Sequence, residues 1–113
     1  MYTEEDHLKG VNNNIKELYH MLKARIIDLG NDIQIKSNKR YIAFRRNYNF
    51  VAVKTRRSML KLTLNLKKSE LNDPLNKARE IESILSEVRI KEPNDIPYVL
   101  QFIQQSYEKS MTR

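Results

Sequence analysis

The 113-residue sequence contains no cysteine, only two glycines and only two histidines. The absence of cysteine excludes disulfides, thiolate nucleophiles and cysteine-based zinc sites, and it is typical of a reducing cytosol. Gly10 and Gly30 stand far apart, which excludes a glycine-rich phosphate loop. Because His7 and His20 have no further histidine with which to share a metal ion, we expect no metal site and no cofactor.

Long apolar runs are also missing. Apolar residues nowhere continue for the roughly 18 positions that a membrane-spanning helix needs. The acidic start, Met1–Asp6, lacks the basic residues and apolar core of a signal peptide. We therefore expect a soluble, cytoplasmic protein. A chain of this length is expected to form a single domain, residues 1–113, with one core.

Acidic residues are absent from one long stretch of the chain. Between Lys36 and Lys68 there are eleven lysines and arginines and no aspartate or glutamate. The rest of the chain holds ten basic and fourteen acidic residues, a net charge of −4, although the whole protein carries +7. Such a one-signed region concentrates anionic partners. This stretch is therefore the candidate binding region.

The same stretch has the pattern of short antiparallel strands. In residues 60–66, leucine alternates with polar residues, which is the period of a strand with one buried face. Residues 41–45 and 48–53 are rich in β-branched and aromatic residues, and Asn47 between them is a good turn residue. Together with a shorter strand at 33–35, they predict a four-strand meander.

A helix is predicted before the meander. Residues 1–13 are polar, and we expect them to form a loose arm. Asn14 is then the expected cap of a helix that ends at Gly30. Apolar residues at helical spacing give this helix its inward face, namely Ile15, Leu18, Tyr19, Leu22, Ile26 and Leu29.

Three further elements are predicted after the meander. Asp73-Pro74 predicts the start of a short helix that ends between Ile81 and Leu85. Val88-Arg89-Ile90 predicts a fifth strand, and Asn94 or Asp95 is expected to cap a last helix that frays at residues 110–113. The order implies an α+β fold with a mainly antiparallel sheet of about five strands. Helices are expected on one sheet face and solvent on the other.

The basic stretch supplies the candidate binding residues. If Ile42, Phe44 and the leucines face inward, Tyr41, Arg45 and Lys61 share the outer face. Cations can neutralise phosphates and tyrosines can stack on bases, so the candidate nucleic-acid contacts are Arg45, Arg46, Lys54, Arg56, Arg57, Lys61, Tyr41 and Tyr48. A charged face that merely prevents strand pairing between molecules is the alternative explanation.

No catalytic motif is present, and we do not expect an enzyme. The nearest approach to a magnesium-dependent nuclease site is Asp73-Pro74 followed by Glu87-Val88-Arg89, in which the usual lysine is replaced. A helix cap explains Asp73 better, and a strand edge explains Glu87 better. The sequence identifies no small-molecule substrate.

Several segments occur in an order that resembles a small prokaryotic domain of unknown function labelled "predicted transport protein". The matching segments cover nearly the whole chain and are Tyr2–Leu8, Ile15–Tyr19, Leu29–Asp32, Lys39–Phe44, Asn49-Phe50, Leu60–Leu66, Glu70–Pro74 and Ile103–Tyr107. That domain is often appended to nuclease-like or restriction-related proteins, so the resemblance implies an accessory domain without catalytic residues of its own. Its members carry a glycine-rich segment before the last strand, whereas Arg79–Leu85 here runs almost directly into that strand.

The predicted order of elements is also similar to that of double-wing domains, which bind DNA through a concave sheet. Two functions are therefore expected from the sequence. The first is a non-enzymatic module that contacts the backbone of DNA or RNA through the basic meander, in a restriction, defence or DNA-processing context. The alternative is a protein-interaction or oligomerisation domain whose charged sheet meets an acidic protein partner or the acidic half of a second copy.

Overall fold

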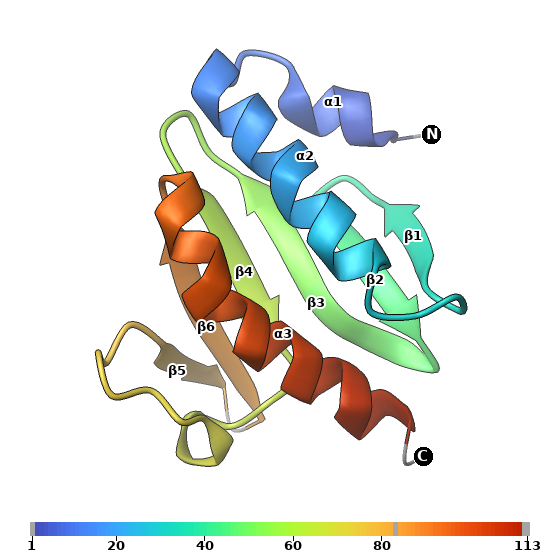
Figure 1. Ribbon diagram of the computed structural model, residues 1–113. Helices are drawn as coiled ribbons and strands as arrows, with labels where there is room; N and C mark the ends of the chain where they lie inside the picture. The colour runs from blue at the N-terminus through green and yellow to red at the C-terminus, as the bar shows by residue number, and fades with distance from the viewer. Residues whose placement is uncertain (1, 83, 112–113) are drawn as a thin grey trace.

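The fold is an antiparallel sheet covered by helices on one face. Over residues 2–82 and 84–111, the computed structural model contains six strands in the order β1-β2-β3-β4-β6-β5 and three α-helices (Figure 1). The strands are β1 (Gln34–Ser37), β2 (Ile42–Arg46), β3 (Tyr48–Thr55), β4 (Leu60–Leu64), β5 (Arg79–Glu82) and β6 (Leu85–Ile90). The helices are α1 (Glu4–Leu8), α2 (Asn13–Ile27) and α3 (Ile96–Met111). The predicted α+β class is confirmed, with one strand more than expected.

The first four strands form the predicted meander. Strand β1 pairs antiparallel with β2, β2 with β3, and β3 with β4. Asn47 makes the turn between β2 and β3 with a φ of 69°, a left-handed conformation that asparagine tolerates. Strand β6 then pairs with β4, and β5 adds to the free side of β6.

The side of the sheet that faces the helices is apolar. Its side chains are almost completely buried, namely Ile42, Phe44, Val51, Val53, Leu60, Leu62, Leu64, Val88 and Ile90. Helices α2 and α3 pack on them with buried residues such as Leu18, Leu22 and Phe102. Each large aliphatic or aromatic side chain contributes about 1.5–3 kcal/mol when it is fully buried. This layer therefore determines which side of the sheet remains open.

The amino-terminal segment is not the loose arm predicted for residues 1–13. Thr3 caps α1, because its hydroxyl accepts from the backbone amide of Asp6 while the Asp6 carboxylate accepts from the amide of Thr3 at 2.8 Å. Leu8 at the end of the helix is buried in the core. Reciprocal capping and one buried leucine are enough to order this short polar segment.

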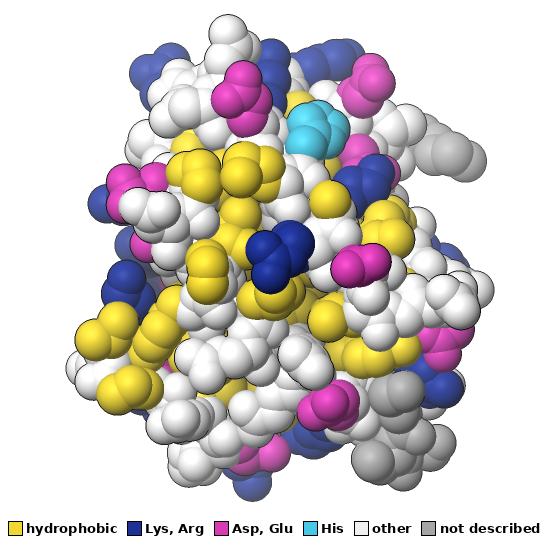
Figure 2. All heavy atoms as spheres, viewed as in Figure 1, with side chains coloured by type: hydrophobic (Ala, Val, Ile, Leu, Met, Phe, Trp, Pro, Cys, Tyr) yellow, Lys and Arg dark blue, Asp and Glu magenta, His cyan; other side chains and the backbone are white. Residues whose placement is uncertain are grey.

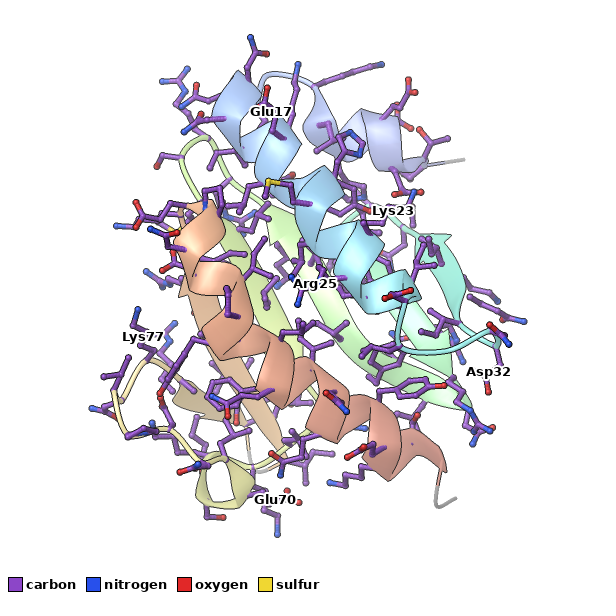
Figure 3. The ribbon with its side chains drawn as sticks, viewed as in Figure 1. Glu17, Lys23, Arg25, Asp32, Glu70 and Lys77 are labelled. Carbon is purple, nitrogen blue, oxygen red and sulfur yellow. The ribbon has the colours of Figure 1, made fainter. Side chains whose placement is uncertain are left out.

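Helix α1 is also tied to α2 by a buried tyrosine. The hydroxyl of Tyr19 donates to the carboxylate of Glu4, and Lys23 forms an ion pair with the same carboxylate at 2.9 Å. Figure 3 labels Lys23 on the side of α2 that faces α1. The prediction of a loose arm was wrong because the partners of Glu4 lie fifteen and nineteen residues away in the sequence.

The predicted short helix after Asp73-Pro74 is absent from the described residues. Asp73 does act as a cap, since its carboxylate accepts from the backbone amides of Lys77 and Ala78. However, Asn76 adopts a φ of 53°, which is incompatible with a right-handed helix. The next residues pair with β6 and become the edge strand β5. Pairing with a neighbouring strand has overridden the local helical pattern.

The two long helices were predicted, but their ends differ. Helix α2 follows Asn12 rather than Asn14, makes no side-chain cap hydrogen bond, and ends at Ile27, before Gly30. The predicted fraying from residue 110 is wrong at Ser110, which is buried within α3 and donates to the backbone oxygen of Tyr107. Residues 112–113, also predicted to fray, lie outside the described residues.

Candidate functional site

The candidate site is the sheet side opposite the helices, which we call the open face. Strand pairing assigns ten residues to this face. They are Lys36 on β1, Ala43 and Arg45 on β2, Asn49, Ala52 and Lys54 on β3, Lys61 and Thr63 on β4, and Glu87 and Arg89 on β6. In the described part of the chain, all three helices lie on the other side (Figure 1). Figure 2 shows that other side, where hydrophobic side chains are grouped and charges of both signs are scattered.

Three cations form a row across the open face, one residue pair from the β3–β4 hairpin. Lys54 on β3 is opposite Lys61 on β4, and Lys61 is opposite Arg89 on β6. Like charges directly opposite one another destabilise a sheet. Among the described residues, neither lysine forms an ion pair with a carboxylate. The row is therefore a local concentration of positive charge without an internal counter-ion at its lysine end.

Glu87 is an acidic residue of this face and is shared between two arginines. Its carboxylate pairs with the Nε atoms of Arg79 and Arg89, each at 3.2 Å. The glutamate side chain is only 11% exposed, whereas those of Arg79 and Arg89 are 64% and 43% exposed. The Glu87 carboxylate thus neutralises one of the two exposed guanidinium groups that it contacts.

Two alanines lie in the middle of the open face, and one of them, Ala52, lines a groove. Ala43 and Ala52 are paired across β2 and β3 and are only 2% and 8% exposed, although no helix covers this side. Tyr41 lies on the same side, and its hydroxyl accepts from Nδ2 of Asn49 at 3.5 Å. Since Asn49 is located beyond the alanine pair, the tyrosine side chain must extend over the alanines to reach it.

The groove has a volume of about 270 Å³. Ala52 and Thr63 form its floor, while Arg40, Tyr41, Asn49 and Lys54 line one side and Asn65, Ile81, Glu82 and Leu85 line the other. These residues come from the segment just before β2, from β3, from the end of β4 and from the β5–β6 hairpin. The hairpin that replaced the predicted helix therefore builds one wall of the groove.

Asn49 carries an unsatisfied polar atom at the edge of this groove. Its Oδ1 atom is buried and has no hydrogen-bond partner among the described residues. Leaving a buried acceptor unpaired costs about 1–3 kcal/mol. Such an atom is expected to accept a hydrogen bond when a suitable donor enters.

Two of the predicted site residues do not belong to the open face. Arg46 points to the helix side and pairs with Asp32 in the loop after α2, a residue labelled in Figure 3. Tyr107 on α3 donates to the same carboxylate at 2.9 Å. This hydrogen bond, and then Arg46, lower the pKa of Asp32 against the opposing effect of burial. Tyr48 is opposite Arg46, and its hydroxyl oxygen is buried.

The other six predicted residues lie on or beside the open face. Tyr41, Arg45, Lys54 and Lys61 belong to the face itself. Arg56 and Arg57 are exposed in the β3–β4 hairpin, immediately beyond the lysine pair. The sequence reasoning missed Lys36, Arg40, Asn49 and Arg89 as members. Alternation along β1 and β6 could have found Lys36 and Arg89, but only strand order shows that Arg89 extends the lysine row.

Within residues 2–82 and 84–111, no group of three or more histidine, aspartate or glutamate side chains is arranged to hold a metal ion. None of the described helices combines the length and the hydropathy that a membrane-spanning segment requires. Asp73, the acidic residue of the nuclease-like fragment, accepts hydrogen bonds from Lys68, Tyr98 and two backbone amides. It is therefore a loop anchor.

Comparison with known proteins gives one family and one relative. A family model described as a domain of unknown function (DUF5655) matches residues 4–110. An uncharacterized protein of Haemophilus influenzae (strain Rd) is 32% identical over 112 residues, which cover 94% of this chain and 37% of that protein. The chain thus spans little more than a third of the length of this relative. No solved structure matches the chain.

Proposed function

The chain belongs to the DUF5655 family, and from this premise we propose that it is a non-enzymatic accessory module that binds the backbone of DNA or RNA through its open face. The observation that carries the proposal is the Lys54-Lys61-Arg89 row. A fold tolerates three adjacent like charges at a cost, and a bound polyanion would remove that cost.

The distribution of charge over the whole face supports the same proposal. Lys36 and Arg45 add two further cations, and neither forms an ion pair within the described residues. Arg56 and Arg57 continue the positive surface at the β3–β4 hairpin. A twisted sheet with cations on three neighbouring strands, about 4.8 Å apart, can follow a phosphate backbone without reading its bases.

An accessory role is consistent with the length of the relative. Because this chain corresponds to 37% of the Haemophilus influenzae protein, that protein has further sequence that could supply chemistry. The segments that resemble the domain labelled "predicted transport protein" support a module attached to a nuclease-like or restriction-related partner. In that context, backbone binding would hold the nucleic acid while another domain acts on it.

The test is fluorescence anisotropy with labelled DNA and RNA across a range of salt. If Lys36, Arg45, Lys54, Lys61 and Arg89 each contact one phosphate, the slope of log K against log salt for duplex DNA should be about −4 to −5. The double variant Lys54→Glu/Lys61→Glu should weaken binding by at least about tenfold, because it reverses two contacts. Reversal of Arg56 and Arg57 is expected to weaken binding less, since both lie at the margin.

A matched control comes from the other side of the molecule. Lys16→Glu/Arg25→Glu changes the net charge by the same amount on α2, and Figure 3 labels Arg25 on this helix. This control should bind nearly as well as the wild-type protein. Equal losses in both double variants would show that only net charge matters, and no binding at low salt would reject the proposal.

A protein-interaction role is the second candidate, and one observation favours it. Ile81 and Ile84 on the β5–β6 hairpin are 38% and 52% exposed beside the basic face. Exposed apolar side chains next to a charged surface are common where proteins associate. Sedimentation without nucleic acid separates the two functions. A dimer that dissociates at high salt would favour this candidate, and a monomer at all salt concentrations would argue against self-association.

A further inference from the structure

The groove on the open face differs from the rest of the basic surface. Backbone binding needs only exposed cations, but this groove combines a tyrosine ring, a floor of small residues and a wall in which Ile81 and Leu85 stand beside Asn65 and Glu82. Its volume of about 270 Å³ is just below the roughly 300–1,000 Å³ of pockets that enclose a drug-sized ligand. It therefore fits one flat ring system rather than a peptide segment or a dinucleotide.

The residues around the groove match the parts of one nucleotide. Tyr41 offers an aromatic face, and Ile81 and Leu85 on the opposite wall offer apolar contact. Asn49 holds a buried carbonyl oxygen without a partner, which suits the N–H group of a base edge. Arg40 and Lys54 lie at the same groove without a carboxylate partner among the described residues, and they suit the attached phosphate.

We propose that this groove binds one unpaired nucleobase of a single strand, stacked on Tyr41, while the surrounding cations hold the flanking phosphates. Among the described residues, the only hydrogen bond of the Tyr41 hydroxyl is the 3.5 Å contact with Asn49, which is at the long limit for such a bond. A rotation of Tyr41 that breaks this contact releases the Nδ2 atom of Asn49, and a base stacked on the tyrosine ring then lies beside an amide whose Oδ1 atom has no partner among the described residues.

Bases inside a duplex are paired and stacked, so they cannot enter the groove. A single strand presents its bases freely, and base–aromatic stacking adds to the phosphate contacts of each nucleotide. The inference deepens the proposed function and rests on it, because the same cations act in both. It adds a preference for single strands that backbone contacts alone do not provide.

The test compares a single-stranded oligonucleotide with a duplex of the same phosphate count, using wild-type protein, Tyr41→Ala, Tyr41→Phe and Asn49→Ala. Wild-type protein should bind the single strand more tightly. Tyr41→Ala should weaken single-strand binding by at least about fivefold and leave duplex binding nearly unchanged. Tyr41→Phe keeps the ring and should retain the preference, while Asn49→Ala should reduce it. Circular dichroism and thermal unfolding report whether each variant is folded.

The outcomes separate this inference from the proposed function. Equal affinity for single strand and duplex, with no effect of Tyr41→Ala, would overturn the inference and leave backbone binding intact. Absence of binding to either would overturn both. A further experiment titrates adenosine and uridine monophosphates. These free nucleotides carry the same base and phosphate groups as a nucleotide of the strand. Binding of these monophosphates that depends on Tyr41, without binding of the strand, would reject the strand as the ligand.

Discussion

The hydroxyl of Tyr107 lies so close to Gly30 that a Cβ atom on residue 30 would be 2.0 Å from it. The tyrosine cannot move away easily, because its hydroxyl donates to Asp32 and its ring packs edge-on against Phe50 at 5.2 Å between ring centres. Gly30 therefore allows the loop after α2 to approach α3. The sequence pattern had suggested only a helix end for this glycine.

Substitution of Gly30 by alanine should destabilise the fold. The added methyl group must displace a tyrosine that is anchored on two sides, and overpacking of this kind costs about 1–3 kcal/mol. Urea denaturation of Gly30→Ala measures the loss. Tyr107→Phe removes the atom at 2.0 Å but leaves the ring carbon Cζ at 2.9 Å from the added methyl group, so the double variant should recover part of the loss. If the losses of stability in Gly30→Ala and Tyr107→Phe simply add up in the double variant, the two residues do not interact in the way proposed.

Reversal of a single charge in the cation row should separate stability from binding. Lys61→Glu places a carboxylate between Lys54 and Arg89, which turns two repulsive cross-strand pairs into attractive ones. We expect the free energy of unfolding to rise by about 0.2–1 kcal/mol at low salt, while nucleic-acid affinity falls. Thermal unfolding and anisotropy on the same samples measure both quantities.

Lys61→Gln is the control for this charge reversal. It removes repulsion without adding attraction, so its stability should lie between those of wild-type protein and Lys61→Glu. The gain should shrink at high salt, because exposed charges are screened. A loss of stability in Lys61→Glu would show that the lysine makes contacts that the row does not explain.

The Asp73 carboxylate should make stability dependent on pH in the acid range. Burial acts to raise the pKa of Asp73, but hydrogen bonds from Lys68, Tyr98 and the amides of Lys77 and Ala78 outweigh it and hold the pKa well below its usual value of 3.8. The folded state therefore binds protons less readily than the unfolded state. This contribution is complete above the unfolded pKa and is lost as the pH falls through the lower, folded value.

The variant Asp73→Asn tests this dependence. It should lower the free energy of unfolding by about 1.5–3 kcal/mol near neutral pH, because hydrogen bonds to a charged group are lost. The gap between the variant and wild-type protein should narrow as the pH drops below about 4. Urea unfolding at a series of pH values measures the gap. A gap that stays constant into strong acid would mean that the charge of Asp73 contributes nothing.

Helix α1 should depend on the Glu4–Tyr19 hydrogen bond. Glu4→Ala leaves the fully buried Tyr19 with an unpaired hydroxyl and should cost about 1–3 kcal/mol. Limited proteolysis should then cut within residues 2–10 faster than in wild-type protein. Adding Tyr19→Phe removes both partners and should restore part of the stability. If Glu4→Ala alone is neutral, α1 is held by Leu8 rather than by this bond.

The local sequence pattern was sufficient to predict the elements whose conformation depends on residues close together in the chain. Alternating leucines in residues 60–66 predicted β4, and Asn47 predicted the turn before β3, because strand periodicity and a left-handed turn depend on near neighbours in the chain. The apolar stripes of α2 and α3 were recognised for the same reason. The α+β class and the basic character of one sheet face follow from these elements.

Long-range contacts decided the elements that were predicted wrongly. Residues 79–82 form β5 because β6 offers them a partner, and residues 4–8 form α1 because Tyr19 and Lys23 bind Glu4. Neither partner is visible in a local window. Arg46 was expected to contact nucleic acid, but Asp32, fourteen residues away, holds it on the helix side.

The candidate site shows the same division between sequence and tertiary structure. The sequence alone determined that cations gather in the meander, since the absence of acidic residues from 36 to 68 is a matter of composition. Only strand order and register placed Lys54, Lys61 and Arg89 in one row and set the β5–β6 hairpin beside the groove. Register follows from burial of the apolar face, and burial is a property of the whole packed core.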